Sequence, residues 1–380
     1  MAEERAKPPP RHLTIRIHPM PSSTPPPRPY LWLAGICAAR VLFNTVNFNY
    51  PAAIPILQPE WGMTATQAGL ILSAFEVGYL LSLVGVSYLS DWMSARRVFL
   101  GSCLGGAFTA MLFAAFARSF ESALLLRFLN ALFLGGAYTP VLKLIAEAFE
   151  SRARGRAMGF FIASAAVGNA LSLSAAGVLI AGWGYRAAFW ATSLGPLLGW
   201  AISWWALRGS TLGAPSPSPR GRTLLALTNK PAMLLLAGYT VHAWELMGMR
   251  YWTPAFITAA VALGGVELAG ATGVGANLSA LFLLAGVAGT AVAGFASDLL
   301  GRTVVIAAMM VISALCSFVF GWAVTLPFWV LVGLGCVYGF AVIADSPVYS
   351  TGFTEVVPPH YLGAALGLRS LAGFGAGAIS

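Results

Sequence analysis

Long apolar runs separated by short polar stretches dominate the pattern along the chain. They begin after a Pro-rich, basic segment at 1–28 and continue to the last residue. A helix of about 20 apolar residues crosses the roughly 30 Å hydrocarbon core of a bilayer. The runs are continuous rather than alternating, which favours helices over the strands of a barrel. The pattern therefore predicts spanning helices at 30–56, 66–89, 98–117, 120–148, 157–181, 186–207, 231–260, 272–296, 303–323, 327–350 and 362–380.

Composition places the chain in the membrane. Only 9% of the 380 residues are charged and 58% are hydrophobic, whereas a soluble domain carries about 25% charged residues. So few charges cannot cover a water-exposed surface, and we expect an all-α integral membrane protein. The net charge of +9 lies in short loops, where it sets topology, so it does not indicate a nucleic-acid partner. The four cysteines lie in apolar runs without metal-ligand spacing, which predicts no metal site.

The distribution of Lys and Arg predicts orientation and domains. Basic residues gather in the tail and in alternate loops. This places the chain in the cell (inner) membrane with its amino terminus and the 208–230 linker on the cytoplasmic side. We expect a disordered tail at 1–28, a six-helix bundle at 29–207, the linker, and a second bundle at 231–380 with helices 7–10 and part of helix 11. The last run stops within a helix, so we expect a six-plus-six plan that is truncated within helix 11.

Two similar polar stretches suggest an internal repeat. Ser-Asp occurs in GVSYLSDWMSARRVFL (85–100) and again in GFASDLLGRTVV (294–305). Asp91 and Asp298 stand 207 residues apart, and each lies after the second span of its half. Repeated halves are typical of secondary transporters.

These stretches resemble the loop signature of the major facilitator superfamily (MFS). The positions that match it are Asp91, Arg96, Gly294, Asp298, Gly301 and Arg302, while Ser87 and Ser94 replace two signature glycines in the first copy. Arg127 followed by a small-residue patch resembles the second signature of the family, and the likeness extends over 30–380. The resemblance implies the MFS-type two-bundle fold, a cavity lined by helices 1, 4, 7 and 10, and gating by the signature loops.

Polar residues within the spans indicate a substrate site. Arg40, Asn44 and Asn47 share one helical face, and a guanidinium beside amides suits a carboxylate. Alternatively, Arg40 pairs with Glu76 to hold spans 1 and 2 together. Arg127 has two interpretations as well: substrate contact or coupling, as the resemblance implies, or anchoring of span 4 through backbone carbonyls.

Tyr138 and Trp244 lie deep in their predicted spans. Rings at such depth either contact a substrate or pack in the core.

Titratable residues in the spans indicate proton coupling. His242 and Glu245 are three residues apart and share a helical face, and a carboxyl group away from water can load and release a proton near neutral pH. The alternative is a His–Glu pair that fixes the helix. Glu76 is a second candidate. Asp345 precedes Ser346 and Pro347, where backbone could open toward a cavity, or it pairs with a loop arginine.

The leading hypothesis is a secondary active transporter that moves a small organic anion with protons by alternating access. Its partners are the small-molecule substrate and the lipid bilayer, and we expect a monomer. No GxxxxGK[ST] loop occurs, so the expected energy source is the proton gradient, without a cofactor. One alternative is proton-driven efflux of a hydrophobic, drug-like compound. A more distant one is a membrane-embedded enzyme or sensor, but His242–Glu245 has no third group to complete a catalytic set.

Overall fold

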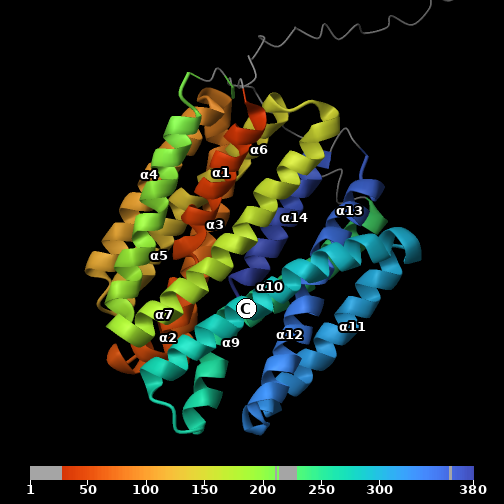
Figure 1. Cartoon of the computed structure of the whole chain (residues 1–380). Helices are drawn as coiled ribbons and strands as arrows, with labels where there is room; N and C mark the ends of the chain where they lie inside the picture. The colour runs from red at the N-terminus through yellow and green to blue at the C-terminus, as the bar shows by residue number, and fades with distance from the viewer. Residues whose placement is uncertain (1–27, 210–211, 214–228, 359–361) are drawn as a thin grey trace, which may run out of the picture.

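A computed structural model describes residues 28–209, 212–213, 229–358 and 362–380 (Figure 1). The tail predicted at 1–28 and most of the predicted linker lie outside the described residues, so both stay predictions. Within the described ranges every element is an α-helix or a short 3-10 helix (η). The all-α fold predicted from the sequence is confirmed.

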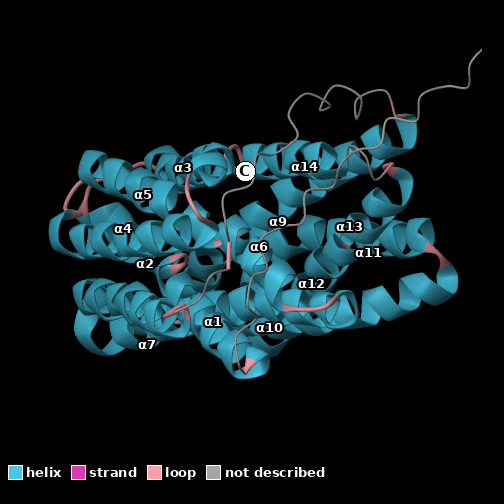
Figure 2. Ribbon diagram, turned by 90° about the horizontal axis from the view of Figure 1, so that it is seen from above, coloured by secondary structure: helices cyan, strands magenta, loops and turns pink. Residues whose placement is uncertain are grey.

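The helices fall into two groups that follow one another along the chain. The first group comprises α1 (Pro29–Phe43), η1 (Asn44–Val46), α2 (Asn49–Glu60), α3 (Ala65–Trp92), α4 (Ala95–Phe116), α5 (Phe120–Leu134), η2 (Gly135–Ala137), α6 (Thr139–Ala148) and α7 (Ser151–Ala206). The second comprises α9 (Lys230–Leu263), α10 (Leu268–Leu300), α11 (Arg302–Phe320), η3 (Gly321–Thr325), α12 (Phe328–Ala344), α13 (Ser346–Val356) and α14 (Leu362–Gly377). Figure 2 shows α3, α4 and α5 on one side of the molecule and α11, α12 and α13 on the other.

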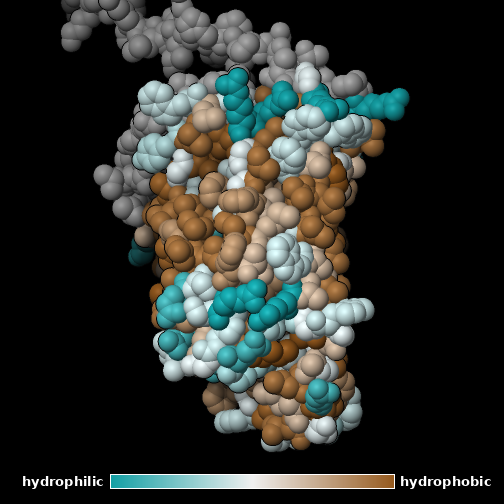
Figure 3. Space-filling model, turned by 90° about the vertical axis from the view of Figure 1, so that its left-hand side faces the viewer, coloured by the Kyte–Doolittle hydropathy of each residue, from teal (hydrophilic) through white to brown (hydrophobic). Residues whose placement is uncertain are grey.

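The described helices match the predicted spans. Eight segments are long and apolar enough to cross a membrane, and one of them, 153–206, contains two spans joined at Gly184 (φ +81°). Counting that pair as two spans, and adding α9 and α14, gives the eleven spans predicted from the sequence. Figure 3 shows a broad apolar band with polar residues above and below it, as a multi-pass membrane protein requires.

Local sequence explains where several helices begin. Thr64 and Gln67 form a reciprocal capping box at the start of α3, and Ser119 and Ser122 do the same for α5. Ser94 accepts a hydrogen bond from the Arg97 amide (3.4 Å) at the start of α4. Such caps satisfy amide groups that have no partner within the helix.

Three of the predicted spans are broken near their middle. Span 1 breaks at η1, span 4 at η2, and span 10 at Asp345, between α12 and α13. Proline contributes to the first break, because the amide that would normally bond the Asn47 carbonyl belongs to Pro51, which has no N–H. Broken spans leave carbonyls and amides that side chains must satisfy, and in transporters they border the binding site.

The two groups share one hydrophobic core at one end of the molecule. We call the end where α1 and α9 begin the proximal end (top of Figure 1) and the opposite end the distal end. At the distal end one core contains residues of both halves, among them Phe48, Phe189 and Phe282. At the proximal end the first half has its own core around Phe99 and Leu144, and the second half has separate cores. This arrangement is closed at the distal end.

Candidate functional site

Arg40 of α1 lies against aromatic rings of its own half. Its guanidinium is 5.3 Å from the ring centroid of Tyr138 and 5.4 Å from that of Phe161, and those two rings stack. Nη1 donates to the Ala137 carbonyl (3.3 Å), while Nε is buried without a partner. Among the described residues Arg40 forms no ion pair, and the partner of Glu76 is Tyr251. Arg40 therefore keeps hydrogen-bonding capacity for an anion.

The asparagines near Arg40 brace the first break. Asn44 donates to the Ala165 carbonyl (3.0 Å) and Asn47 to the Asn169 Oδ1 (3.1 Å), both on α7. The 3-10 turn at η1 interrupts the regular helix on which the common face was predicted. In this state their amide donors hold two helices together.

Arg127 adopts the anchoring geometry that the sequence left open. It is 1% exposed, and its Nη1 and Nη2 donate to the carbonyls of Val46 (2.8 Å) and Asn47 (2.9 Å). Its guanidinium also lies 4.3 Å from the centroid of the Phe75 ring. Arg127 thus satisfies the carbonyls freed by the break in span 1.

His242 of α9 pairs across the second half. Nδ1 lies 2.9 Å from Asp345 Oδ1, and Nε2 lies 2.7 Å from Ser346 Oγ. Both His242 and Asp345 are buried. Glu245, which shares the helical face, instead accepts a hydrogen bond from Ser313 of α11 (3.2 Å). Helical spacing alone could not identify partners that lie on other helices.

Glu76 of α3 contacts the other half of the molecule. It is buried, and Oε1 accepts a hydrogen bond from Tyr251 of α9, while Oε2 has no partner. The Glu76 carboxyl also lies next to Gly377 of α14. The sequence predicted Glu76 as titratable, but Tyr251 was missed because nothing in its local pattern marks it.

The two predicted aromatic contacts differ. Tyr138 lies beside Arg40. We call these two residues, together with Arg369 and Tyr239 of the second half, the polar cluster. Trp244 is half exposed and donates to the carbonyl of Ile379 (3.3 Å), which follows the end of α14. Trp244 is therefore not part of the Arg40 cluster.

Arg369 is a residue of the polar cluster that was not predicted from the sequence as a site residue. Its guanidinium lies 3.8 Å from the centroid of the Tyr239 ring, and Nη2 donates to Ser350 Oγ (2.8 Å). It stands on α14 rather than in a loop. That position within a predicted span was the available signal.

The second signature loop forms a network of ion pairs. Arg302 Nη1 binds Asp298 Oδ1 (2.6 Å) and Nη2 binds Glu355 Oε1 (3.0 Å). Gly301, at φ +89°, makes the sharp turn between α10 and α11 that a side chain would strain. Gly294 has open space around its Cα.

The first signature loop is described less completely. Only the backbone of Asp91 is described, so its predicted gating contact stays a prediction. Arg96 lies in the first turn of α4, beside the Gly213 backbone.

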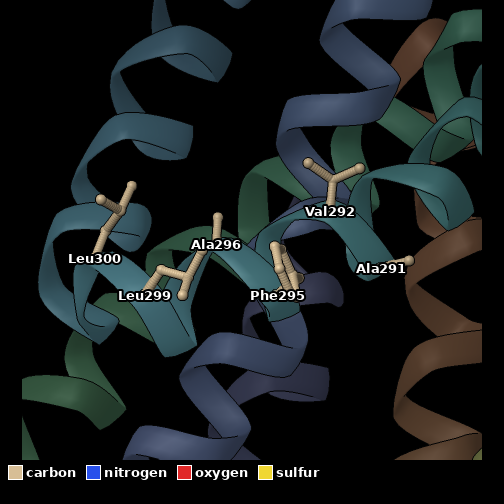
Figure 4. A pocket seen from close by; sticks show the side chains of 6 residues that line it. All are labelled: Ala291, Val292, Phe295, Ala296, Leu299 and Leu300. Carbon is tan, nitrogen blue, oxygen red and sulfur yellow. The ribbon is translucent and has the colours of Figure 1, made fainter.

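An apolar hollow lies on the outer side of α10. Its lining is Ala291, Val292, Phe295, Ala296, Leu299 and Leu300 (Figure 4). Four of these side chains are largely exposed, and none can bind an ion. The hollow suits hydrocarbon chains of lipid, and the polar cluster remains the candidate site. In the described part of the chain, no group of His, Cys, Asp and Glu could hold a metal.

An apolar exterior around two bundles, with charged side chains at broken helices, defines an α-helical multi-pass membrane protein of the transporter type. A family model of the Major Facilitator Superfamily matches residues 36–380, and the chain belongs to that superfamily. This confirms the family and the fold class predicted from the sequence, and with them the expectation that the protein is not an enzyme.

Several known proteins are similar to the chain. The probable 4-methylmuconolactone transporter of Cupriavidus pinatubonensis is 31% identical over 153 residues, which cover 39% of this chain and 35% of that protein. The probable sulfoacetate transporter of Cupriavidus necator is 27% identical over 175 residues, or 46% and 40% of the two chains. The chain thus spans less than half the length of either relative.

The fold is also that of a solved structure. A bacterial homologue of the human lysosomal transporter Spinster, in an inward-facing and occupied conformation, superposes with a TM-score of 0.72 at 19% identity. The match covers 94% of this chain and 81% of that one.

Proposed function

We propose that the protein is a secondary active transporter of a small organic anion, which crosses a cell membrane together with protons by alternating access. Arg40 carries the proposal. A cation inside the bundle raises the free energy of the folded protein unless it has a partner. The described contacts of the Arg40 guanidinium are two aromatic rings and the Ala137 carbonyl. A bound carboxylate would complete its bonds bidentately. One relative, the probable sulfoacetate transporter, is named for a small organic anion of this kind.

The shape of the bundle supports alternating access. The halves share a core at the distal end and have separate cores at the proximal end. With the amino terminus in the cytoplasm, as the basic residues indicate, this state opens toward the cytoplasm. Rocking of the halves about the polar cluster would expose it to the other side.

Titratable groups for proton coupling lie in both halves. Glu76 belongs to the first half, and Glu245 and the His242–Asp345 pair belong to the second. The proton gradient alone would then drive transport, without a cofactor. We propose that a single chain suffices, because each half supplies part of the polar cluster.

Uptake by the full-length protein in liposomes tests the proposal. Labelled sulfoacetate and a panel of aromatic and sugar acids are offered with and without an inward proton gradient. Arg40→Ala should lower uptake roughly tenfold or more, the effect of losing a charge-assisted bond. Arg118→Ala is the matched control, because Arg118 is exposed in a distal loop and its guanidinium donates to the nearby Ala115 carbonyl.

Two results would contradict the proposal. Undiminished uptake by Arg40→Ala would remove Arg40 from the anion site. Uptake of no acid, together with protection of expressing cells against hydrophobic toxic compounds, would favour drug efflux instead.

A further inference from the structure

Arg369 and Arg40 are held in the same way on opposite halves of the molecule. Arg369 lies 3.8 Å from the Tyr239 ring centroid, and Arg40 lies 5.3 Å from that of Tyr138. Each guanidinium donates to neutral acceptors: the Ala137 carbonyl for Arg40, and Ser350 Oγ and the Tyr239 hydroxyl for Arg369. In both, Nε is buried and has no partner. A cation–π contact orients a guanidinium and leaves its donor edge available.

The two arginines face a common region. The ring of Tyr79 on α3, in the first half, packs against that of Phe374 on α14, with centroids 4.9 Å apart, so the helix that carries Arg369 lies beside the first half. The rings beside the two arginines, Tyr138 and Tyr239, lie in the part of the bundle where the halves have separate cores. A ligand there would meet one arginine on each side.

The charge balance of this region calls for an anion. Ion pairs among the described residues are His242–Asp345, Arg302–Asp298 and Arg302–Glu355, so within that part of the chain neither Arg40 nor Arg369 has a carboxylate partner. The buried acids Glu76 and Asp345 are bonded to Tyr251 and His242. Two guanidinium groups without counter-charge favour a ligand with two negative groups.

We infer that Arg369 is the second anion-binding residue of the site, and that the substrate is a small dianion. One anionic group binds Arg40 in the first half and the other binds Arg369 in the second. This inference rests on the proposed function. A dianion bridging the halves would also draw the proximal end together, because it bonds both sides at once.

Competition binding to the purified full-length protein tests the inference. The probes are succinate and its mono-amide succinamate, which have nearly the same size and differ in one charge. The wild type should bind succinate at least about tenfold more tightly, since a bond to a charged group is worth that factor or more. Arg369→Gln should remove most of the preference while leaving succinamate binding nearly unchanged.

Two further variants keep the test decisive. Arg208→Gln is the matched control, because the Arg208 guanidinium also lies 3.8 Å from a ring centroid, that of Trp204, but is exposed at the end of α7. It should keep the full preference. Arg369→Lys retains the charge and should keep part of the preference, which a purely structural role for Arg369 would not predict. Succinate should raise the melting temperature most in the wild type and Arg208→Gln, less in Arg369→Lys, and least in Arg369→Gln.

The outcomes separate the inference from the function on which it rests. Equal loss of both ligands in Arg369→Gln, or an unchanged preference, would overturn the dianion site. So would a wild type that binds both probes equally while Arg40→Gln binds neither; anion transport would then stand. If the wild type binds no organic anion of the panel, the proposed function itself fails.

Discussion

At the distal end, hydrophobic residues of both halves belong to one core, whereas at the proximal end each half keeps its own. Distal contacts across the halves are buried: helices α7 and α10 meet at glycines, and Tyr251 bonds Glu76. The proximal ion pairs of Arg302 are partly exposed and lie within one half. The difference teaches that closing an end takes close apolar packing, with buried polar groups such as Glu76 and Tyr251 bonded to each other, while an open end can rely on solvated charges.

The largest effect is expected for the buried bonds that shape the distal half of the first bundle. Arg127→Met leaves the carbonyls of Val46 and Asn47 without donors, at about 1–3 kcal/mol each. We expect a clearly lower melting temperature of the purified protein. Arg118→Met, at an exposed site, should melt like the wild type. Equal melting of both variants would show that these bonds are not needed.

The next effect concerns the glycines between α7 and α10. A Cβ at Gly177 would lie 2.8 Å from the Ala276 Cβ and 2.9 Å from the Gly273 carbonyl oxygen. Gly177→Val should therefore push the halves apart and raise hydrogen exchange at 268–280. Gly159→Val is the matched control, since Gly159 lies on the same helix with open space around it. If both variants exchange alike, close packing does not hold the distal end shut.

A smaller effect is expected for the hydrogen bond across the halves. Tyr251→Phe removes the donor to Glu76, a loss of about 0.5–1.5 kcal/mol for a typical hydrogen bond, and should also speed exchange at the distal end. Glu76→Gln retains an acceptor for Tyr251 but cannot take up a proton. It should keep the distal end closed and lose pH-driven uptake. The charged groups near Glu76 are Arg250 on α9 and Arg127 on α5, and both remain in either variant. Wild-type pH dependence in Glu76→Gln would exclude Glu76 from coupling.

The smallest effect belongs to the proximal ion pairs. Asp298 is 66% exposed, and exposed pairs contribute about 0–1 kcal/mol. Asp298→Asn should leave the melting temperature nearly unchanged and alter transport rate only at low salt, where charges are poorly screened. Glu267→Gln, an exposed acid at the start of α10, is the control. A large stability loss in Asp298→Asn would mean that the proximal end is as tightly held as the distal one.

Hydropathy was enough to predict the spans, because membrane crossing imposes a length and composition that a sequence displays directly. The partners of the charged residues were harder to predict. His242 pairs with Asp345 rather than acting with Glu245 alone, because residues more than 100 positions away pack against the same helix. The carbonyl acceptors of Arg127 exist only because span 1 breaks at η1.

The site residues were found unevenly for a related reason. Arg40 and Glu76 stood out because charge in the middle of an apolar run is conspicuous. Arg369 was counted with the basic residues near loops, although it lies on α14. Its contact with Tyr239 depends on the packing of α14 against α9, which no local pattern specifies.

The bend in the first span has a consequence for assembly during synthesis. The Val46 and Asn47 carbonyls take their donors from Arg127, which follows about 80 residues later in the chain. Hydrocarbon offers no substitute donor, so the bent form becomes stable only after α5 has inserted beside it. We therefore expect the first span to acquire its final shape only once α5 has packed beside it and Arg127 can donate to these carbonyls.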